Sequence, residues 1–329
     1  MPQTSYPYAC ARISALSKGL ISPSTVRRMA ESSLDDVMRQ LLDARYGNLP
    51  DATPVDCERM IDNERRETAD TIRELSPDPE LTDLFLLQTD VHNLKVLLKA
   101  RLLNQQDVSW QEGGLYSREA LTAMVGSQHY EDLPEELAAA VKDLENRLRI
   151  QSDPQMVSVK LDAGYLAYAM RVVKEKKEPF AIQYFSAMCD FDNVLTFLRM
   201  RAMGAQKEDL KDVLLPEGGI RKAKLIDAYE LTADGLTRAL SGSVAHEAMN
   251  RGLSRMLATG NIGALERERD DYLLSLVSEH KHDVMTIFPI VGYYMARDRE
   301  AQAVRLILTV KRNGLNDAVI QERLRELYG

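Results

Sequence analysis

Three groups of side chains in this sequence could do chemistry: neighbouring carboxylates, neighbouring histidines, and a repeated set of Asp, Asn and Arg. The neighbouring carboxylates include Asp35-Asp36, Glu135-Glu136 and Asp270-Asp271. General acid–base catalysis needs two carboxylates that converge on one point. Adjacent residues on a helix diverge, and acidic residues are favoured in the first turn of a helix. We therefore interpret these pairs as solvated helix surfaces.

The histidines and cysteines do not form a pattern that is typical of a metal site. His280 and His282 are two residues apart and would face different ways on a helix, which makes joint ligation awkward. The three cysteines, Cys10, Cys57 and Cys189, are far apart and form no C-x-x-C pair, so neither zinc nor a disulfide framework is indicated. Nucleotide-binding glycine loops and nucleophile elbows are also missing from the sequence. We expect no cofactor, no metal and no catalytic residue.

The third group, the set of Asp, Asn and Arg, occurs twice in the sequence, 100 residues apart. The segments "DVHNLKVLLKAR" and "DFDNVLTFLRMR" each keep an Asp, an Asn three residues later and an Arg eleven residues later. These residues are Asp90, Asn93 and Arg101 in the first copy, and Asp190, Asn193 and Arg201 in the second. On a helix they share one stripe with apolar residues such as Leu94 and Leu98. The pattern predicts polar groups at both ends of a buried stripe.

A charged group in such a place is costly unless it is paired and hydrogen-bonded. Asp90 and Arg101 would be roughly 16 Å apart along one helix, so they cannot pair with each other. Each must contact a neighbouring helix or cap one. We interpret the set as a repeated contact that fixes how helices dock; the alternative is an exposed helix with charges at its margins.

A weaker third copy lies near the C-terminus, in "EAQAVRLILTVKRNGL". Glu300 takes the place of the Asp, Ala303 that of the Asn and Lys311 that of the Arg. A Gly-Gly pair and an apolar residue follow each of the first two copies, and Gly314-Leu315 follow the third. The spacings predict three related units of about 110 residues. Their expected bounds are 1–115, 116–221 and 222–329.

The composition and the positions of the prolines predict an all-α fold. Aromatic residues make up only 6% of the chain, and prolines stand where apolar-periodic runs begin, as at the first turn of a helix. The chain has no flexible linker, so one compact body is expected. Net charge is −8, which disfavours binding to nucleic acid or direct insertion into lipid. The longest apolar run, residues 286–296, is too short to span a bilayer, which takes roughly 20 residues.

The repeat alone leaves two other functions open. One is a soluble, all-helical adaptor or scaffold protein, although solenoid repeats usually have periods of roughly 20–50 residues. The other is an all-α enzyme with an acidic di-metal site, which would need Glu-x-x-His motifs on two facing helices. The sequence does not supply such a pair of motifs.

The order and spacing of several segments resemble the C subunit of the prokaryotic V-type (A/V-type) ATPase, the counterpart of the d subunit of the eukaryotic vacuolar enzyme. The segments are "YPYACARISALSKGLIS" from Tyr6, "TDVHNLKVLLKARLL" from Thr89, "CDFDNVLTFLRMRA" from Cys189, "PIVGYYMARDREAQAVRLILTVKRNGL" from Pro289 and "IQERLRELY" from Ile320. Ala303 stands where the family usually carries Asn.

The resemblance implies a funnel of three similar helical subdomains around a pseudo-threefold axis. It implies a non-catalytic central-stalk (rotor) subunit that joins the shaft subunits, of D and F type, to the proteolipid ring in the membrane. Such a subunit transmits torque in proton or sodium transport. It would lie in the cytoplasm, peripheral to the membrane.

Overall fold

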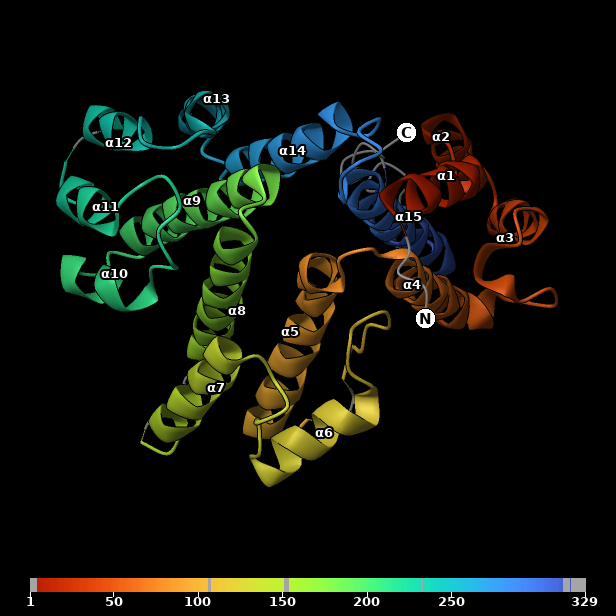
Figure 1. Cartoon of the computed structure of the whole chain (residues 1–329), viewed down its shortest axis with the longest axis horizontal. Helices are drawn as coiled ribbons and strands as arrows, with labels where there is room; N and C mark the ends of the chain where they lie inside the picture. The colour runs from red at the N-terminus through yellow and green to blue at the C-terminus, as the bar shows by residue number, and fades with distance from the viewer. Residues whose placement is uncertain (1–4, 106–107, 151–153, 232, 316–319, 321–329) are drawn as a thin grey trace. The chain divides into compact units, whose positions relative to one another are not determined.

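The protein folds into helices joined by turns and loops (Figure 1). The structure is a computed structural model that describes residues 5–105, 108–150, 154–231, 233–315 and 320. None of these residues forms a β-strand, and the prediction of an all-α fold is confirmed. Residues 321–328, the end of the last segment quoted for the resemblance, lie outside the described part.

The α-helices are α1 (Tyr6–Leu16), α2 (Pro23–Glu31), α3 (Leu34–Asp43), α4 (Cys57–Leu75), α5 (Pro79–Leu103), α6 (Arg118–Ser127), α7 (Glu135–Leu148), α8 (Pro154–Lys176), α9 (Pro179–Ala202), α10 (Lys207–Val213), α11 (Lys222–Ala228), α12 (Ala233–Leu240), α13 (His246–Thr259), α14 (Gly263–Glu279) and α15 (Phe288–Arg312). The three copies of the polar set lie on α5, α9 and α15. These are three of the longest helices, as the repeated stripe requires.

Local sequence explains where many helices begin. Ser22, Ser33 and Ser117 each precede a helix, and each side-chain oxygen accepts a hydrogen bond from the backbone N–H three residues further on, at 3.1 to 3.2 Å. This bond satisfies one of the donors that a first turn leaves unpaired. The serines therefore set the starts of α2, α3 and α6.

The three repeat helices, α5, α9 and α15, begin and end at the same distances from the repeated carboxylate. A proline stands eleven residues before the repeated carboxylate in each of them: Pro79, Pro179 and Pro289. A residue with positive φ stands fourteen residues after it: Asn104 (51°), Gly204 (70°) and Gly314 (61°). A left-handed residue at this position ends a helix. Gly314 is therefore a helix stop, and it is not the counterpart of the Gly-Gly pairs.

The chain packs as two compact units rather than one body. The first comprises Met1–Asp90, Trp110–Tyr116 and Val277–Gly329, and the second Val91–Ser109 and Ser117–Leu276. The expectation of a single body is wrong because the first boundary falls inside α5, where no glycine- or proline-rich linker can mark it. The three units of about 110 residues, and the funnel, remain predictions.

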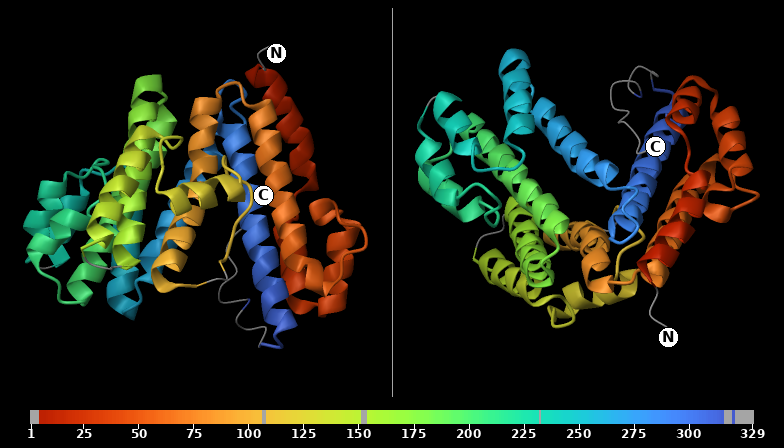
Figure 2. Two further views of the ribbon diagram at one scale, coloured as in Figure 1. Left: turned by 90° about the horizontal axis from the view of Figure 1, so that it is seen from below. Right: turned by 45° about the horizontal axis from the view of Figure 1, so that its top comes forward.

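In the first unit, α15 lies beside α4 and α1 (Figure 2). One apolar core gathers side chains of α2, α3, α4 and α15, including Met29, Leu41, Met60 and Ile307. A second core lies between α1, α4, α5 and α15 and includes Ile72. The N-terminal and C-terminal helices of the chain thus share their cores.

In the second unit, α8 packs closely against α7. A Cβ atom on Gly164 would lie only 2.6 Å from the Cβ of Ala140 and 3.1 Å from the Cα of Leu137. The small residues therefore allow the two backbones to approach. Helix α8 also packs against α9, where the rings of Tyr165 and Phe185 meet edge-on with centroids 6.3 Å apart.

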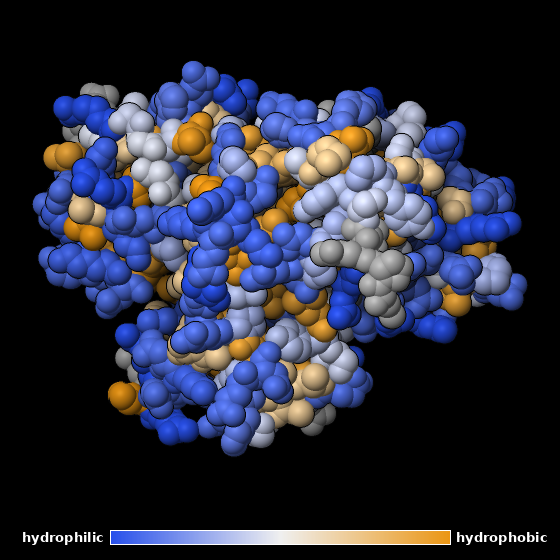
Figure 3. Space-filling model, in the orientation of Figure 1, coloured by the Kyte–Doolittle hydropathy of each residue, from blue (hydrophilic) through white to orange (hydrophobic). Residues whose placement is uncertain are grey.

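Hydrophilic side chains predominate on the face of the molecule shown in Figure 3, with hydrophobic ones scattered between them. Among the described helices, none has a stretch long and apolar enough to cross a bilayer.

Candidate functional site

The first repeated carboxylate holds a piece of backbone. Asp90 is fully buried on α5 and accepts hydrogen bonds from the backbone N–H groups of Leu115 (2.7 Å) and Tyr116 (3.2 Å). A Cβ atom on Gly114 would lie 2.1 Å from Asp90 Oδ1, so only glycine fits beside the carboxylate. Burial raises the pKa of Asp90 to about 7, against the lowering effect of the two hydrogen bonds.

At the other end of the stripe, Arg101 forms hydrogen bonds with helices α6 and α7. Its Nη2 donates to both carboxylate oxygens of Glu145 on α7, at 2.7 and 2.6 Å. Its Nη1 donates to the carbonyl oxygen of Val125 on α6, at 2.8 Å. The hydroxyl of the buried Tyr130 donates to the same Glu145, at 2.5 Å. Charge-assisted bonds of this kind are the strong ones, so α6 and α7 are positioned on α5.

The second copy holds its backbone partners in the same way. Asp190 is buried on α9 and accepts from the N–H groups of Gly219 (3.0 Å) and Ile220 (2.9 Å). Burial raises the pKa of Asp190, while these bonds and one from Ser243 lower it. Asn193 accepts from the Leu215 N–H at 2.7 Å. Its counterpart Asn93 is also buried.

Arg201 departs from the pattern. It is exposed, and its guanidinium lies over the ring of Phe197 on the same helix, 5.6 Å from the centroid. That ring meets Tyr229 edge-on at 5.3 Å. Arg201 therefore covers an aromatic pair at the C-terminal end of α11 and does not sit within the buried stripe.

The third copy reaches the N-terminal part of the chain. Glu300 is buried on α15 and accepts from the Ile21 N–H at 2.5 Å. Lys311 donates through Nζ to the carbonyl oxygen of Ala30 on α2, at 2.9 Å. Burial raises the pKa of Glu300, while Arg297 beside it lowers it.

Sequence reasoning missed a charged cluster between α4 and α15. Arg297 contacts Glu300 at 2.6 Å and Glu64 at 3.1 Å, and Glu64 accepts from the Gly47 N–H at 2.9 Å. A signal was available, since Glu64 lies on the same helical stripe as the apolar Met60. A polar residue on such a stripe needs a partner.

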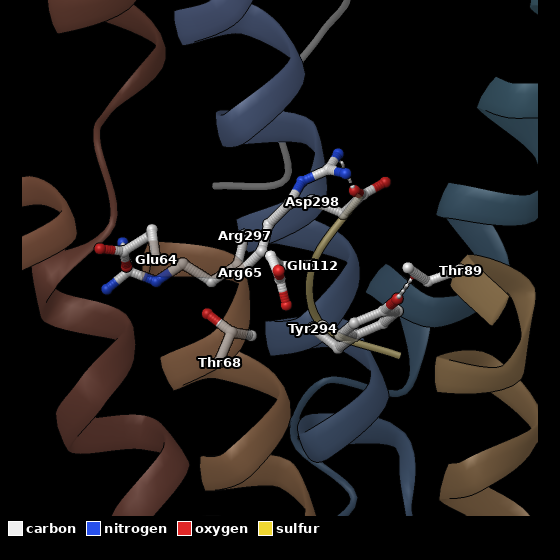
Figure 4. A pocket seen from close by; sticks show the side chains of 9 residues that line it. Glu64, Arg65, Thr68, Thr89, Glu112, Tyr294, Arg297 and Asp298 are labelled. Carbon is white, nitrogen blue, oxygen red and sulfur yellow. Dashed lines mark hydrogen bonds and ion pairs between the residues drawn. The ribbon is translucent and has the colours of Figure 1, made fainter. Parts of the chain in front are cut away.

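Beside this cluster lies a cavity within the first unit (Figure 4). Its lining includes Arg65, which pairs with Asp298 at 2.6 Å, and the Tyr294 and Thr89 hydroxyl oxygens, 3.4 Å apart. The cavity volume is about 10 Å³, enough for about one water molecule. It has no room for a nucleotide. Among the described residues, no three His, Cys, Asp or Glu side chains could hold a metal ion together.

Asp90, Asp190, Asn193 and Glu300 thus each hold the backbone of a neighbouring segment. The structure brings Asp90, Asp190 and Glu300 each onto backbone amides. We interpret them as positioning residues.

Comparison with known proteins identifies the family of the chain. The profile of the ATP synthase (C/AC39) subunit family matches residues 9–323. The chain belongs to this family. It is 23% identical to the C subunit of the V-type sodium ATPase of Enterococcus hirae over 312 residues, which cover 94% of each chain. It is 24% identical to the C subunit of the A-type ATP synthase of Pyrococcus abyssi, over 99% of this chain and 90% of the relative.

Membership in the ATP synthase (C/AC39) subunit family confirms the resemblance that was based on the quoted segments. The match includes all three copies of the polar set. The contacts of Asp90, Asp190 and Glu300 are thus structural features of a member of this family.

Proposed function

We propose that this chain is the non-catalytic central-stalk (rotor) subunit of a V-type ATPase or ATP synthase. It joins the central shaft, built of D- and F-type subunits, to the proteolipid ring, and it transmits torque during proton or sodium transport. It works peripheral to the membrane, on the cytoplasmic side. The observation that carries the proposal is the family match over residues 9–323.

The geometry of the polar residues supports a mechanical role. A part that carries torque must resist local opening, which begins where contacts are weakest. Asp90, Asp190 and Glu300 each add hydrogen bonds between a long helix and a loop. A typical intramolecular hydrogen bond contributes about 0.5–1.5 kcal/mol. Three such contacts would hinder slippage of the helices under load.

Co-purification separates the proposal from its alternatives. The tagged chain is expressed at its native level, the membranes are solubilised, and the proteins that accompany it are identified. We expect ATPase subunits and the proteolipid. Soluble partners alone would support an adaptor instead, and turnover by the purified chain would support an enzyme.

A second experiment tests coupling. Membranes that contain the complex without this subunit should lose ATP-driven ion transport, while the catalytic part still hydrolyses ATP. Adding the purified chain should restore transport, and the Gly126→Ala variant should do the same, since nothing lies within 4 Å of the new methyl group. Transport that does not depend on the added chain would contradict the proposal.

A further inference from the structure

Helices α2, α6 and α11 share one spacing of a glycine, an N-cap residue and three buried apolar residues. Their N-cap residues are Ser22, Ser117 and Arg221. In each case a glycine lies three residues before the N-cap: Gly19, Gly114 and Gly218. The buried apolar residues lie four, seven and eight residues after it: Val26, Met29 and Ala30 on α2; Leu121, Met124 and Val125 on α6; Leu225, Ala228 and Tyr229 at α11.

The same carboxylate position holds the same backbone position in all three. The residue just before the N-cap donates its N–H to the repeated acid: Tyr116 to Asp90 (3.2 Å), Ile220 to Asp190 (2.9 Å), and Ile21 to Glu300 (2.5 Å). In the first two pairs the donor lies 26 and 30 residues after the acid, but in the third it lies 279 residues away, at the start of the chain.

In two of the three copies, the cation eleven residues after the acid holds the other end of the short helix. Arg101 donates to the carbonyl of Val125, and Lys311 donates to the carbonyl of Ala30. Both carbonyls lie eight residues after an N-cap. Arg201 lies close to Tyr229, which occupies the same position after Arg221, because both contact the ring of Phe197.

We infer that α2 is the short helix of the third repeat and that α15 is its docking site. Each long helix then holds one short helix: α5 holds α6, α9 holds α11, and α15 holds α2, which lies at the other end of the sequence. The contacts of α5 with α6 and of α9 with α11 join segments that follow one another along the chain. The contact of α15 with α2 is a non-covalent clasp between its ends. This inference does not depend on the proposed function.

The clasp has a direct test in the full-length protein. Lys311→Met removes the bond to the Ala30 carbonyl, and Arg312→Met is the matched control because it removes the same charge from an exposed neighbour on α15. Hydrogen exchange is measured by mass spectrometry. One hydrogen bond contributes about 1 kcal/mol, so we expect K311M to speed exchange in residues 23–31 about five-fold and to leave α6 unchanged. Equal exchange of residues 23–31 in both variants would overturn the clasp.

A circular permutant tests the cyclic order. Residues 329 and 1 are joined by a flexible Gly/Ser linker, and the chain is opened between Ala205 and Gln206, in the loop between α9 and α10. In the permutant, α15 and α2 lie on one continuous stretch of chain. Helices α9 and α11 are then held together only by their non-covalent contacts. We expect helix content and cooperative thermal unfolding like those of the natural chain carrying the same linker at one end. A permutant that loses either property would overturn the cyclic order.

Discussion

The carboxylate of Asp90 should make the stability of the protein fall as the pH rises toward neutrality. Burial raises its pKa from 3.8 to about 7. The folded protein therefore holds this proton over a pH range in which the unfolded chain has lost it. A raised carboxylate pKa contributes stability that is complete below the unfolded pKa and is lost as the pH rises through the folded value. Asp90→Asn removes this titration.

The expected magnitude follows from the shift. Each pH unit between the two pKa values changes the free energy of unfolding by about 1.4 kcal/mol. From about pH 5 to about pH 8 the contribution of Asp90 falls by about 2–3 kcal/mol, and most of that fall is complete near pH 7. The free energy of unfolding of wild type minus that of D90N should fall by this amount between about pH 5 and about pH 8. Above about pH 8 it should be constant, because Asp90 is ionised in both states.

The chain offers its own probe for this measurement. Trp110 is the only tryptophan and belongs to Trp110–Tyr116, the segment whose last two residues donate to Asp90. Urea unfolding followed by tryptophan fluorescence, at several pH values, gives the free energies for wild type and D90N. Asp51→Asn is the control, since Asp51 is exposed and its variant should track wild type. A wild type–D90N difference that stays flat or grows with pH would refute the reasoning.

Three further variants test the contacts of α5 and α9, and Gly126→Ala serves as a control. Gly114→Ala should destabilise the protein by about 2–4 kcal/mol, because its methyl group would overlap the Asp90 carboxylate. Gly126→Ala, in open space on α6, should stabilise it by about 0.5–1 kcal/mol. Equal urea midpoints for the two variants would contradict the close approach of Gly114 to Asp90. Asn193→Ala should cost about 1–3 kcal/mol, since a buried backbone N–H loses its acceptor; the prediction fails if thermal unfolding is unchanged. Glu145→Gln weakens the hydrogen bonds to Arg101 and should lower the free energy of unfolding by about 1–3 kcal/mol. Urea unfolding at low and at high salt measures this change. An unchanged free energy of unfolding at both salt concentrations would show that the pair is only a surface contact.

Much of the fold could be predicted because helices carry local signals. Periodic apolar residues, prolines at first turns and the repeated stripe identified the all-α class and the three long helices that carry the polar set. The sequence also showed that Asp90 and Asp190 need partners. It could not show that these partners would be backbone amides, because a carboxylate on a stripe does not reveal which segment packs over it.

The third repeat shows the same limit more sharply. Gly314 resembles a counterpart of the Gly-Gly pairs by its place in the sequence, but it ends α15. The glycine that lies three residues before an N-cap, as Gly114 and Gly218 do, is Gly19 near the other end of the sequence. Arg201 was expected on the buried stripe, yet it is exposed over Phe197. Glu64 and Arg297 were missed because their pairing joins helices that are more than 200 residues apart.

By itself, the sequence determined that the fold is all-α, where many helices begin, and that a polar set recurs on three of them. These features depend on residues within a few turns of one another, so they can be inferred from local spacing. Only the tertiary structure decided that α15 binds α2, that α5 runs through two compact units, and which amides the carboxylates hold. Such contacts depend on the packing of the whole chain, and the free energy of a buried charge is set by the groups that this packing brings around it.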